Sequence, residues 1–231
     1  MGWPHGGGEY AEETYGEVTV LVGARRVAYP YANSLLVRGA DATLLVNPSL
    51  SLVHGAPPPD VVLVSHAHED HMAGLGGYDV PVHDHDADLS PLRSREVMVA
   101  GFGYPPEEAD AADRMLHDDF CVTGRPDAVG FTDGTVFDLG GHTVTMVHLP
   151  GHTPGHSGFL IEPDGFFFEF WRGLAEFAEV VERREAALLA FLAEPRTVPE
   201  IADHRLVYRP HVSGPHVDPV ERHTATHHLA A

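Results

Sequence analysis

The chain has 231 residues, a formal net charge of −20 at pH 7 and a hydrophobic fraction of 43%. A chain of this length and apolar content can form one sizeable globular domain with a small appendage. The strong negative charge argues against the phosphate backbone of a nucleic acid as the main partner. No apolar stretch approaches the roughly 18 residues that a membrane-spanning helix needs.

The N-terminal segment and the cysteine content indicate the cellular compartment of the protein. The first eight residues contain neither the basic start nor the apolar core of a signal peptide, and we expect residues 1–16 to form a flexible leader. Cys121 is the only cysteine, so no intrachain disulfide can form. A reducing cytoplasm is therefore the expected location.

Short apolar runs separated by Gly, Pro and Asp predict many strands in the first two thirds of the chain. From residue 171 to residue 193 the apolar period becomes helical. Thr197 and Glu200 then have the spacing of a capping box, and Asp218 marks the start of a last helix. The predicted strands cover residues 18–22, 34–37, 43–46, 61–64, 80–82, 136–139, 143–149, 159–161 and 166–168, with a helix over residues 105–118. This order predicts an α/β domain followed by a small helical unit.

The strongest functional signal directly follows the predicted strand at residues 61–64. Four side chains of the metal-ligand type fall within six positions: His66, His68, Asp70 and His71. A strand buried on both faces commonly presents functional groups at its C-terminal end. Ligands at this spacing cannot all reach one ion from a regular strand or from one helix face. We therefore expect a tight turn that directs two of them at one metal and two at a neighbouring one.

A second pair of histidines, His152 and His156, follows another predicted strand within the sequence Pro-Gly-His-Thr-Pro-Gly-His. Together with the earlier His-x-His-x-Asp-His, this motif resembles the metallo-β-lactamase fold superfamily over roughly residues 18–168. The resemblance implies a four-layer αβ/βα sandwich with a metal site on the shared edge of two sheets. We expect this domain over residues 17–170, followed by a helical or winged-helix unit over residues 171–231.

The resemblance also implies the ligands and the chemistry. His66, His68 and His152 would hold one Zn²⁺, while Asp70 and His71 would contribute to a second. Imidazole and carboxylate groups suit Zn²⁺, and three protein ligands with one open position are typical of a catalytic site. A metal-bound hydroxide would be the nucleophile, and Asp70 would orient it and help to protonate the leaving group. For His156 we expect a supporting or packing role.

The chain departs from the superfamily pattern after the strand at residues 166–168. Relatives carry an Asp there that bridges the two metals, but the only carboxylate in place here is Glu169. His204, His211 and His216 lie beyond the next helix, and none stands in a matching motif. Either the chain is naturally shortened here, or a segment of the natural protein before Glu169 is missing from this sequence. For a shortened chain we expect one tightly bound Zn²⁺ and a weak or empty second position.

Three further features carry their own expectations. The run His83-Asp84-His85-Asp86 has ligand-like spacing but no counterpart in the superfamily motifs, and we expect a solvated loop. Asn47 stands where relatives often have Asp, and we expect it to support the metal loop by hydrogen bonding. Cys121 is expected to be a small core residue rather than a nucleophile.

These observations predict a zinc-dependent hydrolase acting on a small ester or thioester, because the acidic chain disfavours long polyanions. The partner would be a small-molecule substrate, with no membrane or nucleic acid involved. Missing strands in one sheet could leave an edge for a homodimer. The alternative is a catalytically degraded metal-binding or interaction protein, because the bridging Asp is missing. A nuclease would need a basic groove that the sequence does not show.

Overall fold

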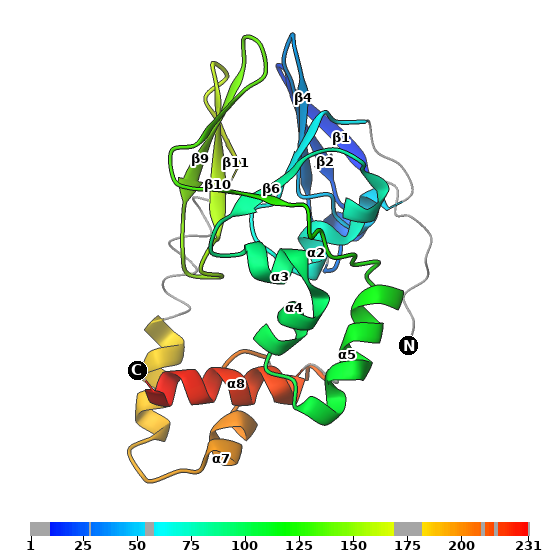
Figure 1. Cartoon of the computed structure of the whole chain (residues 1–231). Helices are drawn as coiled ribbons and strands as arrows, with labels where there is room; N and C mark the ends of the chain where they lie inside the picture. The colour runs from blue at the N-terminus through cyan, green and yellow to red at the C-terminus, as the bar shows by residue number, and fades with distance from the viewer. Residues whose placement is uncertain are drawn as a thin grey trace. The chain divides into compact units, whose positions relative to one another are not determined.

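The computed structural model describes residues 10–27, 29–53, 58–168, 182–208, 211–214 and 217–230 (Figure 1). Contacts between residues divide the chain into two compact units. The first comprises residues 1–98 and 111–169, and the second comprises residues 99–110 and 170–231. Among the described residues, no helix is both long and apolar enough to span a bilayer.

A seven-stranded sheet in the first unit contains the strands in their sequence order. Its first four strands are antiparallel, and the remaining three continue in parallel from the fourth. They are β1 (Ala11–Tyr15), β2 (Val18–Val22), β3 (Ser34–Arg38), β4 (Thr43–Val46), β5 (Val61–Leu63), β6 (Val82–His85) and β7 (Val129–Phe131). Parallel strands are buried on both faces, which explains the uninterrupted apolar sequences of β4 and β5.

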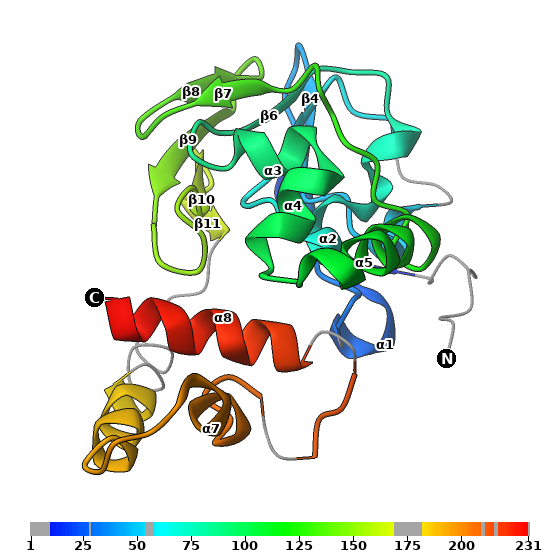
Figure 2. The same cartoon turned by 60° about the horizontal axis from the view of Figure 1, so that its bottom comes forward.

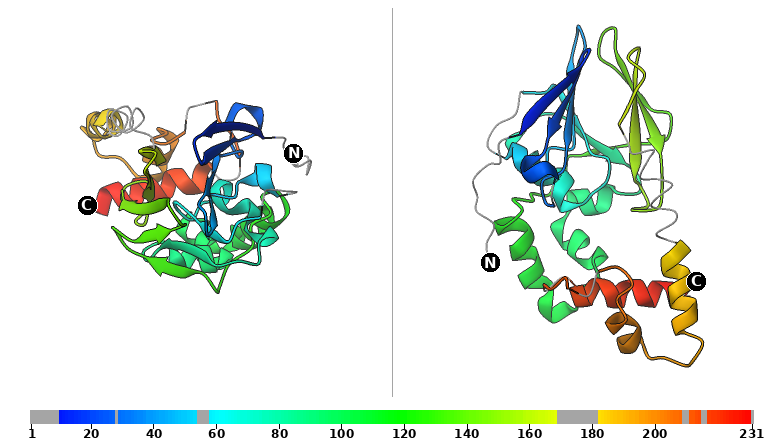
Figure 3. Two further views of the ribbon diagram at one scale, coloured as in Figure 1. Left: turned by 90° about the horizontal axis from the view of Figure 1, so that it is seen from above. Right: turned by 180° about the vertical axis from the view of Figure 1, so that it is seen from behind.

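A second, four-stranded antiparallel sheet lies beside the first as a separate layer (Figure 3). Its order is β11-β10-β9-β8, with β8 (Val136–Asp138), β9 (Thr143–His148), β10 (Ser157–Glu162) and β11 (Phe166–Phe168). One apolar cluster joins the two sheets and includes Leu35, Val46 and Leu63 from the first with Met146 and Phe159 from the second. This two-sheet sandwich with helices confirms the α/β sandwich predicted from the sequence.

Short helices follow the parallel strands. After β5 comes α2 (Glu69–Met72), and after β6 comes α3 (Leu89–Arg93), which lies beside the sheet in Figure 2. The remaining helical segments of this half of the chain are α1 (Ala24–Val27), η1 (Leu50–Leu52), η2 (Ala73–Gly77), α4 (Arg95–Gly101) and α5 (Pro106–Asp118). Because the carboxyl ends of neighbouring parallel strands meet at one edge, the segments that follow β4, β5 and β6 converge there.

The second unit contains the C-terminal helical region, although residues 171–181 of the helix predicted over residues 171–193 lie outside the described residues. Residues 182–191 are helical, followed by α7 (Val198–Asp203) and α8 (Val217–Ala230). The capping box of Thr197 and Glu200 is confirmed at the start of α7. The buried carboxylate of Glu221 accepts hydrogen bonds from the three successive backbone amides of residues 206–208, at distances of 2.7 to 3.1 Å.

Two sequence expectations are wrong. The leader expected over residues 1–16 is too long, because Ala11–Tyr15 forms β1, paired with β2. This edge strand is exposed along its length and therefore lacks the alternating pattern that reveals most strands. The solvated loop expected at His83-Asp84-His85-Asp86 is instead largely strand β6, in which Asp84 is fully buried.

A first prediction concerns the contribution of the apolar cluster between the sheets to the stability of the fold. The side chain of Ile161 is fully buried in that cluster, whereas Val136 on the same sheet is 55% exposed. We expect Ile161→Ala to lower the free energy of unfolding by about 2–5 kcal/mol, because it leaves a cavity. The matched variant Val136→Ala should lower it by less than about 1 kcal/mol. Urea unfolding followed by circular dichroism measures both, and equal losses would contradict the assignment of the core.

Candidate metal centre

The first histidine motif lies where β5 leaves the sheet. After the buried Val64 and Ser65, the chain turns through His66 and His68 into the single helical turn of α2. The backbone amide of His68 donates to the carbonyl of His66 at 2.9 Å, and the amide of His71 donates to that of His68 at 3.1 Å. The tight turn predicted from the ligand spacing is therefore confirmed.

The second motif forms the connection between β9 and β10. We call residues 149–156 the His152 loop. Its two ends are joined by a 2.7 Å hydrogen bond from the amide of Leu149 to the carbonyl of His156. The amide of Ser157 donates to the carbonyl of Ser65 at 2.9 Å, which links the start of β10 to the end of β5. This link brings the two motifs together.

Three histidines meet at this junction. His66, His68 and His152 each offer a ring nitrogen, and these nitrogens all lie within 4.8 Å of one another. His66 is buried, His68 is partly buried and His152 is exposed, so the group opens towards solvent on the side of His152. The three residues are those that the sequence proposed for one zinc ion.

The other motif residues surround this group. The ring centroids of His71 and His156 lie 4.2 and 5.0 Å from that of His66. Asp70 lies beside His71, with 3.6 Å between its Oδ2 and the Nε2 of His71. His71 thus lies against His66, and Asp70 lies beside His71, as the expected neighbouring metal position would place them.

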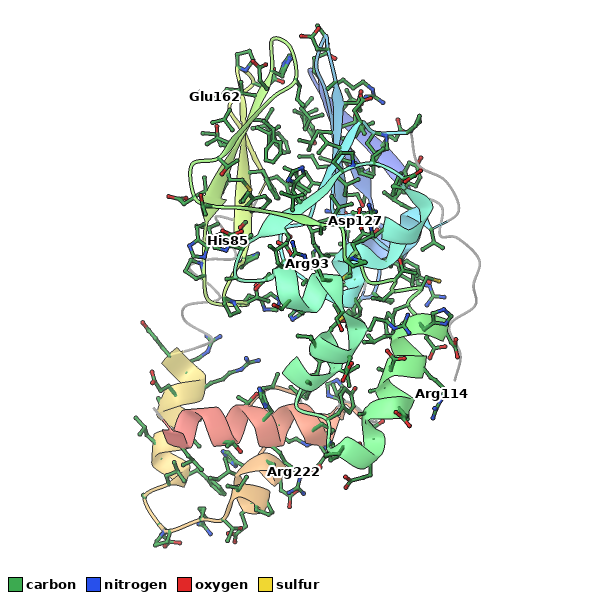
Figure 4. The ribbon with its side chains drawn as sticks, viewed as in Figure 1. His85, Arg93, Arg114, Asp127, Glu162 and Arg222 are labelled. Atoms are coloured by element: carbon green, nitrogen blue, oxygen red, sulfur yellow. The ribbon has the colours of Figure 1, made fainter. Side chains whose placement is uncertain are left out.

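The remaining ligand candidates do not add to the described centre. Glu169 and His216 lie outside the described residues. His204 stacks on Phe191 in the second unit, with ring centroids 4.0 Å apart. His85 is also not in the group, because its ring stacks on that of His148 at 4.0 Å, at the end of β6 (Figure 4).

Burial keeps the histidines of the centre uncharged. Loss of hydration lowers the pKa of His68 to about 4 and that of His71 to about 3. The pKa of His66 is also strongly lowered, first by burial and then by the neighbouring imidazoles. The ring of His152 is packed by three other imidazoles, and desolvation lowers its pKa to about 4. Neutral imidazoles are the form that binds a metal.

The carboxyl group of Asp70 shifts in the opposite direction. Burial raises its pKa to about 7, and the charge of Glu69 adds to the rise. In the absence of a nearby cation, this carboxyl group is therefore about half protonated at neutral pH.

Two ring nitrogens of the centre lack a partner. The Nε2 of His66 and the Nδ1 of His71 are buried and make no hydrogen bond. Buried polar atoms are nearly always satisfied in native proteins, so such exceptions call for a specific explanation. A metal ion held by His66 at the first position, and one held by His71 at the neighbouring position, would satisfy these nitrogens, and imidazole is a preferred ligand of Zn²⁺. The residues present thus fit the metal that the sequence motifs imply.

A chain of hydrogen bonds orients His66 from behind. The side-chain amide of Asn47 donates to Ser65 Oγ at 2.9 Å, and its carbonyl oxygen accepts from the backbone amide of Ser65 at 2.8 Å. Ser65 Oγ lies 3.1 Å from His66 Nδ1. The supporting hydrogen bonds expected of Asn47 are therefore present. Ser65 was not singled out from the sequence, because a Ser at the end of a strand carries no specific signal.

Two further contacts at the centre were also missed by sequence reasoning. The hydroxyl of Tyr29 donates to Glu69 Oε1 at 2.5 Å, next to His68 and Asp70. The buried Asp88 accepts hydrogen bonds from Thr153 and Gly155 in the His152 loop. These partners are between 40 and 67 residues apart in sequence, so no local pattern connects them.

Comparison with known proteins gives a family model and distant relatives. The model of the β-lactamase superfamily domain matches residues 26–76, which include the first histidine motif but cover less than half of the chain. Hydroxyacylglutathione hydrolase GloC of Haemophilus influenzae is 28% identical over 105 residues, which are 43% of this chain and 43% of that enzyme. The chain therefore matches less than half of the length of this curated relative.

Solved structures with a similar fold include a β-lactamase domain protein from Burkholderia ambifaria, with a TM-score of 0.50 and 20% identity. The match covers 72% of this chain and 59% of that protein. MEM-A1, a subclass B3 metallo-β-lactamase from a soil metagenome library, has a TM-score of 0.47 and 19% identity, covering 70% and 61% of the two chains. The chain thus has the metallo-β-lactamase fold, and its residues 26–76 match the model of the β-lactamase superfamily domain.

The lowered pKa values predict that the metal-free protein loses stability in acid. The unfolded histidines bind protons near pH 6.5, while the folded His68 and His152 do so only near pH 4. Between these values the unfolded state holds more protons, so acid favours unfolding. Asp70 opposes this trend, because its raised pKa lets the folded state hold a proton that the unfolded state has lost. Since four histidines of the centre titrate low, their effect should prevail.

Thermal unfolding of chelator-treated protein, measured between pH 6.5 and 4.5, tests this prediction. The melting temperature should fall as the pH falls, and the fall should be smaller in His68→Gln, which lacks one of the titrating rings. His117→Gln is the matched control, because His117 is exposed and remote in sequence. A melting temperature that rises steadily towards pH 4.5 would contradict the burial of neutral histidines.

Proposed function

We propose that the protein is a zinc-dependent hydrolase of small esters or thioesters. The observation that carries the proposal is the convergence of His66, His68 and His152, with a buried and unpartnered nitrogen on His66. Three histidines with one side open to solvent match the ligand set of a catalytic zinc site rather than of a structural one. When bound there, zinc would lower the pKa of a coordinated water and so supply a nucleophile at neutral pH.

The residues of this chain have separate roles in this proposal. His66, His68 and His152 bind the metal, and the hydrogen bonds of Asn47 and Ser65 hold His66 in place. Asp70 lies beside His71, and in this proposal its carboxylate accepts a proton and returns it to the leaving group. His71 lies next to Asp70 and would share in a second metal position.

The choice of substrate class rests on the net charge of the chain and on its similarity to a curated hydrolase. The net charge of −20 disfavours long polyanionic substrates, which leaves small molecules as the preferred class. The curated relative from Haemophilus influenzae is named as a hydrolase of hydroxyacylglutathione, in which an acyl group is carried on a thiol. We therefore place thioesters first among the candidates and simple carboxylic esters second.

The number of metal ions bound distinguishes a one-metal from a two-metal centre. The described part of the chain brings three histidines to one position but only Asp70 and His71 to the neighbouring one. We expect one tightly bound Zn²⁺ per chain, with any second ion lost on dialysis. Elemental analysis of zinc-loaded protein after extensive dialysis measures this. Two ions retained per chain would contradict the prediction and indicate a second ligand set.

Activity tests the catalytic role directly. Zinc-loaded protein would be assayed on a panel of thioesters, lactones and phosphodiesters, before and after chelation. We expect thioester hydrolysis that chelation abolishes and zinc restores. His66→Ala should lower kcat/KM by more than about 100-fold, because even groups that only support a metal ligand contribute 10- to 100-fold. His117→Ala, which removes an exposed histidine, should retain the activity.

The outcome also separates the two classes of protein considered. Metal-dependent turnover that requires His66 supports an enzyme. Tight zinc binding without turnover on any substrate of the panel would instead favour a metal-binding protein that has lost catalysis.

A further inference from the structure

The His152 loop lacks a strand or helix of its own, yet it must hold one of the three converging histidines. Its ends are fixed by the sheet, through the bonds of Leu149 and Ser157 described above. The ring of His148 adds a third contact, with 2.9 Å between its Nε2 and the carbonyl oxygen of Pro154. The middle of the loop is fixed from a different part of the chain, the turn between β6 and α3.

Asp88 provides this contact. Its carboxylate accepts a hydrogen bond from Thr153 Oγ1 at 2.5 Å and another from the backbone amide of Gly155 at 2.8 Å. One oxygen serves each donor, and the two donors lie on either side of Pro154, directly after His152. The side chain of Asp88 is only 2% exposed, so these bonds are shielded from water. Hydrogen bonds to a buried carboxylate are stronger than those between neutral groups.

The position of Asp88 in its own helix makes this arrangement unusual. Asp88 precedes α3 as its N-cap residue, where an Asp side chain normally accepts from the first backbone amides of the helix. Here the side chain makes no capping hydrogen bond. Its backbone instead holds the turn, through bonds of 2.9 Å to the carbonyl of His85 and 3.2 Å from the amide of Leu92. Both side-chain oxygens are thereby left for the His152 loop.

The close approach of the loop explains the glycine at residue 155. A Cβ atom added there would lie 2.7 Å from Asp88 Cγ, closer than real Cβ atoms come to their neighbours. The backbone of the loop is therefore packed directly on the carboxylate, and a larger residue would push the loop away. The contact between Asp88 and the His152 loop therefore combines two hydrogen bonds, from Thr153 and Gly155, with close packing at Gly155.

The charge of Asp88 also reaches the histidines. Burial lowers the pKa of both His68 and His152, and the negative charge of Asp88 acts against that effect at both. Asp88 is thus close enough to interact electrostatically with two of the three converging rings. A buried negative charge on the residue that holds the His152 loop favours a cation among these rings.

We propose that Asp88 is a positioning residue for the metal centre, which fixes His152 through its hydrogen bonds to Thr153 and Gly155. The inference rests on the proposed metal-binding role of His66, His68 and His152. It assigns to the turn after β6 a function that neither histidine motif contains.

Zinc affinity, measured by competition with a chromophoric chelator on the full chain, tests this proposal. Asp88→Asn keeps the size of the side chain but removes its charge and one of its two acceptor oxygens. Thr153→Val removes one donor and leaves the charge, while Thr153→Ser restores the hydroxyl. Asp86→Asn is the matched control, because it removes an exposed negative charge two residues away. Thermal unfolding of each metal-free variant reports separately on the stability of the fold.

We expect Asp88→Asn to weaken zinc binding by about 10- to 100-fold and Thr153→Val by about tenfold, as for other groups that support metal ligands. Thr153→Ser and Asp86→Asn should bind zinc within about threefold of the wild type, a change too small to reflect loss of such a group. A purely structural role would lower the melting temperatures of the metal-free variants while leaving zinc affinity unchanged. That result, in both Asp88→Asn and Thr153→Val, would overturn the proposal. Failure of the wild-type chain to bind zinc would overturn the proposed function as well, so the two failures are distinguishable.

Discussion

The hydrogen bonds that join Asn47, Ser65 and His66 are the constraint on which the rest of the centre depends. A neutral imidazole that coordinates a metal through Nε2 carries its proton on Nδ1, and a hydrogen-bond partner there fixes this tautomer and the orientation of the ring. Ser65 Oγ lies 3.1 Å from Nδ1 and is placed to be that partner, and Asn47 holds the hydroxyl in place. The backbone of Asn47 is itself fixed by the ends of neighbouring strands. Its backbone amide donates a hydrogen bond to the carbonyl of Leu63, and its backbone carbonyl accepts one from Ser34 Oγ. The positions of the strand ends therefore fix the orientation of the His66 ring, and with it the position of Nε2, the nitrogen available to a metal.

The parallel strands explain why the supporting groups come from distant parts of the sequence. Asn47 follows β4, Ser65 and His66 follow β5, and Asp88 follows β6. Each strand ends at the same edge of the sheet, so its first polar residues arrive at a common place. The second sheet contributes His152 through the connection of β9 to β10. The three histidines can therefore meet only if the two sheets pack in one relative position. The apolar core between the sheets sets that position and so supports the site.

Much of the fold and the main ligands could be predicted from the sequence. The buried runs of β4 and β5 and the two histidine motifs are local patterns, and each has a direct physical meaning. Other features could not be predicted, because they depend on contacts across the chain. Edge strand β1 buries nothing and so shows no pattern, and Asp84 looked solvated until the sheet was seen to cover it. Asp88 carries no signal in the sequence, and only the folded chain shows that its side-chain oxygens accept hydrogen bonds from another loop.

The packing of imidazoles around His66 has a consequence for how the protein acquires its metal. His68, His71, His152 and His156 all have ring centroids within 5.0 Å of that of His66, and the described donors at the first position are all nitrogen. Nitrogen sites of this kind generally bind Cu²⁺ more tightly than Zn²⁺, so affinity alone does not select the ion. The metal found in a given preparation will therefore reflect which ions the expressing cell or the purification resin supplied. Biological selectivity would then depend on coordination geometry and on the cell's control of metal availability rather than on affinity alone.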